Sequence, residues 1–161
     1  MALYAISNTQ AGSQQSLTSS YKTIIVLTAA TATLRRAWIY EAEMGADGAP
    51  SNTDGPVVFQ WSRQTAAGTA TSATPNPLDA ADGVAGTVAA VNATAEGTVT
   101  ANSELLTIAL NQRNSQRWIA RDEKSALIIP ATNLAGIAAR AKSPVSSSYA
   151  STVIMSQHFA E

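Results

Sequence analysis

The chain has 161 residues, with 10 basic and 11 acidic side chains, a formal net charge of −1 and no cysteine. This balance offers no basic field for nucleic acid and no block of Lys or Arg for an anionic membrane, so neither partner is expected. The absence of cysteine excludes disulfides and thiolate-bound metals. The first residues lack the charged and apolar regions of a signal peptide, and the longest apolar cluster, Ile24–Leu27, is too short to span a bilayer. Charged residues make up only 13% of the chain, a composition that suits strands in close surface contact more than a solvated helical bundle.

The N-terminal segment divides into a short strand and a polar stretch. Leu3–Ser7 can form a strand, whereas Asn8–Ser20 is rich in Ser and Gln, as linkers and mobile arms are. From Tyr21 the chain becomes apolar and β-branched. We therefore predict an N-terminal strand and polar arm over residues 1–20 and a single β-sandwich domain over residues 21–161.

The stretch Leu34–Gln64 is the predicted centre of the fold. Its first run, Leu34–Met44, alternates with a period of two, as a half-buried strand does. A helix capped by Thr33 and ended by Gly45 is the rival interpretation, and the spacing of the aromatic residues favours the strand. The face expected to be apolar carries Leu34, Trp38, Tyr40, Ala42 and Met44, and the opposite face carries Arg35, Ala37, Ile39, Glu41 and Glu43.

The second run places Val57, Phe59 and Trp61 on one face, which we expect to lie in the core. Gln60, Ser62 and Gln64 are expected on the opposite face. Between the two runs, Gly45–Pro56 is rich in turn-forming residues and has little to bury, so it is predicted to be a long exposed loop.

Similar short runs continue to the last one, Val153–Phe159, at spacings near ten residues. No long helical patterns alternate with them, which argues against an α/β fold. This pattern predicts an all-β fold, either a β-sandwich or a jelly-roll-like arrangement, built from eight to ten short, mostly antiparallel strands.

Few residues suggest catalysis. His158 is the only histidine, no G-x-S-x-G turn supplies a nucleophile, and a zinc site built from several histidines is impossible. Glu41 and Glu43 could act as an acid–base pair or hold calcium, but such a pair is more often the solvated face of a strand. We therefore expect no enzyme and no cofactor; the alternative is a hydrolytic enzyme that depends on His158, Glu41 and Glu43.

A basic and aromatic group comprises Arg113, Arg117, Arg121 and Trp118. It could stack on bases or sugars, or it could form ion pairs with a neighbouring protein, because Arg and Trp are favoured at interface hot spots. The near-zero net charge favours the protein interface. The three tryptophans, Trp38, Trp61 and Trp118, are expected to be core residues.

Five segments cover nearly the whole chain in order, and none of them is a catalytic motif. The segments are MALYAISNT, LTAATATLRRAWIYEAEMGADGAP, WSRQTAAGTATSATPNPLDAAD, NATAEGTVTANSELLTIALNQRNSQRWIA and IIPATNLAGIAARAKSP. Together they resemble a family of small structural proteins encoded in the head-gene regions of tailed bacteriophages.

This resemblance implies a virion protein that decorates, or cements, the phage head. Such a protein is a β-sandwich, often a homotrimer, that sits on the capsid surface and clamps neighbouring copies of the major capsid protein. It would be made in the cytoplasm of the host bacterium. Two other interpretations remain open: a tail or baseplate component of the virion, and a carbohydrate-binding module that uses Trp38 or Trp118 as a platform.

Two segments are candidate contacts with the capsid or with other copies. The N-terminal arm could add a strand to the sheet edge of a neighbour, and the loop Gly45–Pro56 is the other candidate contact. The alternative is that residues 3–7 pair inside their own sheet and that the loop is merely exposed. The residues predicted at protein contacts are Leu3, Tyr4, Ile6, Asp47, Asp54, Arg113 and Arg117.

Overall fold

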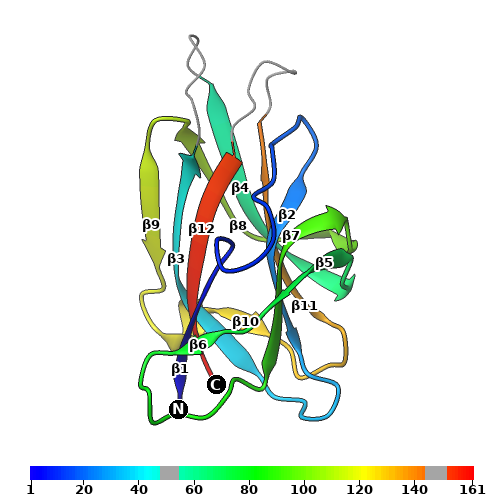
Figure 1. The fold of residues 1–161 in the computed structure, drawn as a ribbon, viewed down its shortest axis with the longest axis vertical. Helices are drawn as coiled ribbons and strands as arrows, with labels where there is room; N and C mark the ends of the chain where they lie inside the picture. The colour runs from blue at the N-terminus through cyan, green and yellow to red at the C-terminus, as the bar shows by residue number, and fades with distance from the viewer. Residues whose placement is uncertain (48–54, 144–151) are drawn as a thin grey trace.

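Twelve strands build the computed structural model, which describes residues 1–47, 55–143 and 152–161 (Figure 1). The strands form two six-stranded antiparallel sheets, A and B, that pack against each other. Over the described residues there is no α-helix, only the 3₁₀ turn η1 (Glu123–Ser125). The predicted all-β sandwich is confirmed, with twelve strands in place of the eight to ten expected.

Sheet A has the strand order β10-β3-β12-β1-β6, and β9 also pairs with β3. Because β12 pairs along almost the whole of β3, the two short strands β9 and β10 share its other edge. The strands of sheet A are β1 (Leu3–Ser7), β3 (Ala37–Asp47), β6 (Asn76–Pro77), β9 (Ser115–Ile119), β10 (Leu127–Ile129) and β12 (Thr152–Ala160).

Sheet B has the order β5-β7-β2-β11-β4-β8. Its edge strands are therefore β5 and the long strand β8. The strands of sheet B are β2 (Lys22–Ala29), β4 (Pro56–Ala66), β5 (Thr69–Ala73), β7 (Thr87–Ala95), β8 (Thr98–Asn111) and β11 (Gly136–Lys142).

The core lies between the sheets and follows the alternation of their strands. From sheet B, Val57, Phe59 and Trp61 are at most 2% exposed, as their period of two predicts. From sheet A, Met155 and Phe159 on β12 are fully buried. Apolar area removed from water in this layer is the main stabilising contribution, at roughly 25 cal/mol per Å².

The N-terminal twenty residues belong to this sandwich. Strand β1 lies between β12 and β6, so both of its edges are paired. Asn8 is fully buried and Leu17 lies in the core cluster. Residues 3–7 thus pair inside their own sheet, which was the alternative to a separate arm.

A buried pair of amides joins the two sheets. Asn8, at the end of β1, donates to the Val153 carbonyl oxygen at 2.8 Å and accepts from the Met155 N–H at 2.9 Å. It also contacts Asn92 of β7, whose amide donates to the backbone of Asn8 and Ala11. Since buried polar groups are costly unless they are satisfied, this network holds sheet A against β7 in one position.

Two turns at one end of sheet B touch backbone to backbone. Gly68, between β4 and β5, and Gly97, between β7 and β8, lie against each other. A Cβ atom at Gly68 would overlap the carbonyl oxygen of Ala95. Glycine is therefore required here by the close approach of two chains.

Replacing Gly68 with Ala should lower the free energy of unfolding by about 1–3 kcal/mol, because the added methyl group must push two turns apart. Urea denaturation would measure the change. Gly83→Ala is the matched control, since no heavy atom lies within 4 Å of a Cβ at Gly83, and its effect should stay within about 0.5 kcal/mol. Equal stability of the two variants would contradict the close packing of the turns.

Candidate functional site

An extra residue in β3 decides which side chains reach the outer surface of sheet A. Ile39 is paired with Phe159, whereas Glu41 is paired with His158, so Tyr40 has no partner of its own on β12. Such a β-bulge changes the phase of the alternation along the strand. Ile39 lies in the core before the bulge, and Ala42 lies in the core after it.

The bulge corrects the predicted faces of the first run. Ala37 and Ile39, expected outside, are fully buried, while Trp38 and Tyr40, expected inside, are only partly buried. Beyond the bulge the prediction is right, because Ala42 and Met44 are buried. Glu41 and Glu43 share the outer face, as predicted, but Glu41 is only 7% exposed.

Glu41 is covered by two partners from neighbouring strands. One carboxylate oxygen accepts a hydrogen bond from Nε of Arg117 on β9 at 2.5 Å, and the other lies 3.3 Å from Nδ1 of His158 on β12. Arg117 also lies 3.5 Å from Glu43. The Tyr40 ring is tilted against that of His158, with 6.1 Å between the centroids. We call Glu41, Arg117 and His158 the ionic cluster.

The hydrogen bond from Arg117 lowers the pKa of Glu41 below its usual range, against the opposing effect of burial, and the His158 contact lowers it further. Burial raises the pKa of Tyr40, and the neighbouring Glu41 carboxylate adds to this rise. Glu41 is thus held as an anion in a nearly closed position on the sheet surface. The cluster ties β9, a strand of only five residues, to β3.

Glu41→Gln should reduce the free energy of unfolding at pH 7 by about 0.5–1 kcal/mol, a small value because Arg117 is exposed to solvent. The folded-state pKa of Glu41 is depressed, so its stabilisation is present above the unfolded pKa and is lost as pH falls through the folded value. The difference between the two proteins should therefore be smaller at about pH 3, below the unfolded pKa, than at pH 7. Denaturant melts at both pH values would show it.

Glu43→Gln is the matched control, because its side chain is 58% exposed and should change stability by less than about 0.5 kcal/mol. A Glu41→Gln effect that is the same at pH 3 and pH 7 would contradict the ionic account of the cluster.

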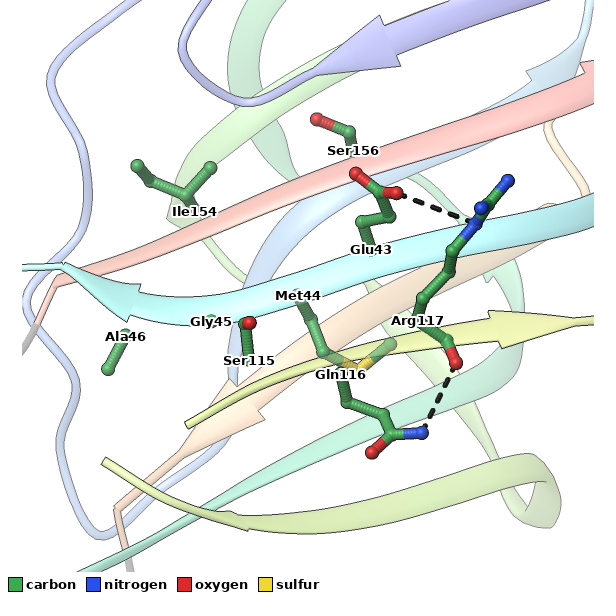
Figure 2. Close-up of a pocket in the computed structure, with 9 residues that line it drawn as sticks. All are labelled: Glu43, Met44, Gly45, Ala46, Ser115, Gln116, Arg117, Ile154 and Ser156. Carbon is green, nitrogen blue, oxygen red and sulfur yellow. Dashed lines mark hydrogen bonds and ion pairs between the residues drawn. The ribbon is translucent and has the colours of Figure 1, made fainter. Parts of the chain in front are cut away.

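Next to the cluster, the outer face of sheet A is hollowed. The floor is Gly45, which has no side chain, flanked by Ile154 of β12 and Ser115 of β9 (Figure 2). In Figure 2 the Glu43 carboxylate points toward Arg117 at one end of the hollow. This hollow has a volume of 420 Å³ and is lined by Glu43, Met44, Gly45, Ala46, Ser115, Gln116, Arg117, Ile154 and Ser156.

A second hollow, of 270 Å³, lies on the same face at the end of the sheet that holds the chain termini. Trp38 and Tyr40 of β3 and Leu3 of β1 form its apolar part, and Asp122 and Glu123 also line it. The outer face of sheet A thus carries three features: the second hollow with Trp38 and Tyr40, the ionic cluster, and the first hollow around Gly45. We call these surfaces together the A face.

The predicted contact residues fall into different environments. Leu3 and Arg117 lie on the A face. Tyr4 and Ile6 point into the core, where they are 4% and 1% exposed, and Tyr4 stacks on Phe159. They are therefore not surface contact residues in this fold.

The other predicted contacts are not among the described residues that line the two hollows of the A face. Asp47 ends β3, and its carbonyl oxygen accepts a hydrogen bond from the Thr152 hydroxyl at 2.6 Å. Arg113 is exposed in the turn between β8 and β9. Asp54, and the part of the predicted loop over 48–54, lie outside the described residues.

The structure separates the basic and aromatic group. Trp118 is paired with Ala42, which faces the core, whereas Arg117 is paired with Glu43 on the outside, so the two side chains leave opposite faces of β9. Of the three tryptophans predicted in the core, Trp61 is fully buried, and Trp118 is partly buried and packs against the core cluster. The prediction was wrong for Trp38, which is partly exposed on the A face.

Sequence reasoning placed Trp38 and Tyr40 on the core side of the first run, and it did not name Ile154 as a contact residue. One signal was present: the apolar residues of AWIYEAEM change phase between Ile39 and Ala42, which is what a bulge produces. A strict period of two cannot accommodate both halves of this run.

In comparisons with models of protein families, with curated proteins and with solved structures, no match to the chain was found. Within residues 1–47, 55–143 and 152–161 there is no group of three or more His, Cys, Asp or Glu side chains placed to hold a metal ion. The same residues contain no helix with the length and apolar character needed to cross a membrane.

Proposed function

We propose that this protein is a head-decoration, or cement, protein of a tailed bacteriophage and that its A face binds the major capsid protein. The observation that carries the proposal is the A face itself, where paired strands present partly exposed aromatic side chains and exposed isoleucines beside an ionic cluster. The resemblance of the sequence segments to phage head proteins supplies the identity of the partner.

The side chains of the A face are of the types that dominate protein interfaces. Trp, Tyr and Arg are enriched at binding hot spots, and here Trp38, Tyr40 and Arg117 lie on one surface. Ile154 and Ile119, 39% and 55% exposed, extend the apolar area. Because these side chains stand on paired strands, their positions are largely set before binding, which lowers the entropy lost on association.

A decoration protein stabilises a shell through many such contacts. Binding that favours the assembled capsid shifts the equilibrium toward assembly by mass action. Each contact can be weak, since several copies linked on one shell raise the effective concentration of the others. The homotrimer, the capsid-surface location and the absence of an enzymatic role remain parts of this proposal.

Gly45→Trp should weaken binding to capsids at least about tenfold, because the indole would fill the hollow in the A face. The fold should tolerate the change, since a Cβ at Gly45 lies 3.4 Å from its nearest heavy atom, the Cβ of Ser115. Co-sedimentation with capsids that lack the protein would measure the affinity. Gly83→Trp is the control, as the same indole is then placed in open space.

If Gly45→Trp and Gly83→Trp bind capsids equally well, the A face is not the contact surface. If the wild-type protein fails to bind capsids but co-purifies with tails, the tail or baseplate interpretation replaces this one.

One observation favours a second candidate, a carbohydrate-binding module. Trp38 and Tyr40 form an aromatic surface with Asp122 and Glu123 nearby, and such surfaces can stack on sugar rings while carboxylates accept hydrogen bonds from hydroxyl groups. In this case, host surface polysaccharide should shift the tryptophan fluorescence, and Trp38→Ala should abolish the shift. No shift with the wild-type protein would eliminate this candidate.

A further inference from the structure

In the described part of the chain, the long strand β8 leaves one edge of sheet B open. It has 14 residues, and β4 is its only strand partner among the described residues (Figure 1). An edge strand exposes a row of backbone N–H and C=O groups that can pair with another chain. The free edge of β8 is therefore a template for an added strand.

The second half of β8 lacks the features by which proteins normally block such an edge. Its first half is irregular, because the register with β4 shifts between Glu104 and Val99 and Asn102 has a positive φ of 54°. From Leu105 to Asn111 the pairing with β4 is regular, apart from the shift at Leu105, and the strand contains no charged residue, Pro or Gly. Charges, prolines and bulges are the usual protection.

Three apolar side chains on the core side of this segment are incompletely covered. Leu106, Ile108 and Leu110 are paired with Trp61, Phe59 and Val57, which are at most 2% exposed. The three β8 residues themselves are only partly buried. The core of the sandwich is thus open along β8, so that an added strand would bury apolar area as well as backbone.

We propose that two copies of this chain pair through β8, antiparallel and centred on Ile108. The sequence Leu106-Thr107-Ile108-Ala109-Leu110 is symmetric in its apolar pattern. In this register Leu106 lies opposite Leu110 of the partner subunit, Ile108 opposite Ile108 of the partner subunit, and Thr107 opposite Ala109 of the partner subunit. Sheet B then continues into the second copy.

The position of the one charged residue of β8 selects this arrangement. Glu104 is the only charge in the strand, and in the antiparallel register it lies beyond the paired segment. A parallel in-register pair would place two Glu104 carboxylates side by side, which is destabilising. The self-symmetric apolar pattern is the reason to assign a second copy as the occupant. The contact is separate from the A face and does not depend on capsid binding.

The double variant Thr107→Lys/Ala109→Lys should halve the particle mass measured by light scattering. Both residues are exposed, so the fold is retained, and in the proposed register each lysine meets a lysine of the partner subunit. Val84→Lys/Val88→Lys adds the same charge at residues that are 82% and 50% exposed and away from the edge, and it should leave the mass unchanged.

The mass is halved when a dimer dissociates into monomers. It is also halved when a hexamer dissociates into trimers, if the copies also associate about a three-fold axis. Three results would overturn the proposal. The wild-type protein could be monomeric at all concentrations, the edge lysines could leave the mass unchanged, or the mass could fall by a factor of three.

Cysteine pairing tests the register, because the chain contains no cysteine of its own. Directly opposite residues have Cα atoms about 4.5–5.5 Å apart, within disulfide range, whereas diagonal neighbours are roughly 7–8 Å apart. An equimolar mixture of Thr107→Cys and Ala109→Cys should therefore cross-link at least about tenfold faster than either variant alone. Cross-linking no faster than that of Val84→Cys overturns the register even if the lysine variant fails to fold.

Discussion

The extra residue that β3 inserts at Tyr40 is the constraint on which the rest of the structure depends. Without it, Glu41 would point to the same side as Ile39, and an ionised carboxylate would enter the core at a cost of several kcal/mol. With it, Ile39 and Ala42 both lie inside, and Glu41 lies outside between Arg117 and His158. One bulge thus completes the core of sheet A and creates the ionic cluster on its surface.

The two sheets of the sandwich offer different surfaces for contact with other proteins. Sheet A presents aromatic and ionic side chains on paired strands, and β1 contributes to this surface through Leu3 while it buries Tyr4 and Ile6. Sheet B, over the residues that the structure describes, offers an unpaired backbone edge at β8. We infer two kinds of protein contact from these two surfaces: side chains of the A face against a different protein, and backbone of β8 against a second copy.

Local patterns were enough to predict the fold class, but not the pairing of distant segments. The period of two placed Val57, Phe59 and Trp61 in the core correctly, and it located the last strand, which runs from Thr152 to Ala160. It did not predict that β1 pairs with the last strand, because antiparallel pairing between the ends of a chain leaves no local signal. Residues 8–20 look like a linker, yet Asn8 and Leu17 are buried by contacts with distant strands.

The candidate site was less predictable, because it depends on where strands meet. Arg117 was predicted at a protein contact, but its link to Glu41 spans 76 positions in the sequence. Glu41 and Glu43 were expected to be equally solvated, and only the neighbouring strands β9 and β12 distinguish them. Trp38 reaches the surface because the alternation of inward and outward side chains in β3 is reversed before the bulge. A single continuous alternation along the strand does not predict this reversal.

The central claim is that this protein binds a phage head through the A face. Electron cryo-microscopy of intact virions, at a resolution that shows side chains, tests this claim most directly. The account predicts density for the sandwich on the outside of the capsid, with β12, β3 and β9 turned toward the shell and Arg117 and Ile154 in contact with the major capsid protein. A sandwich attached through another surface, or particles whose heads lack this protein, would contradict it.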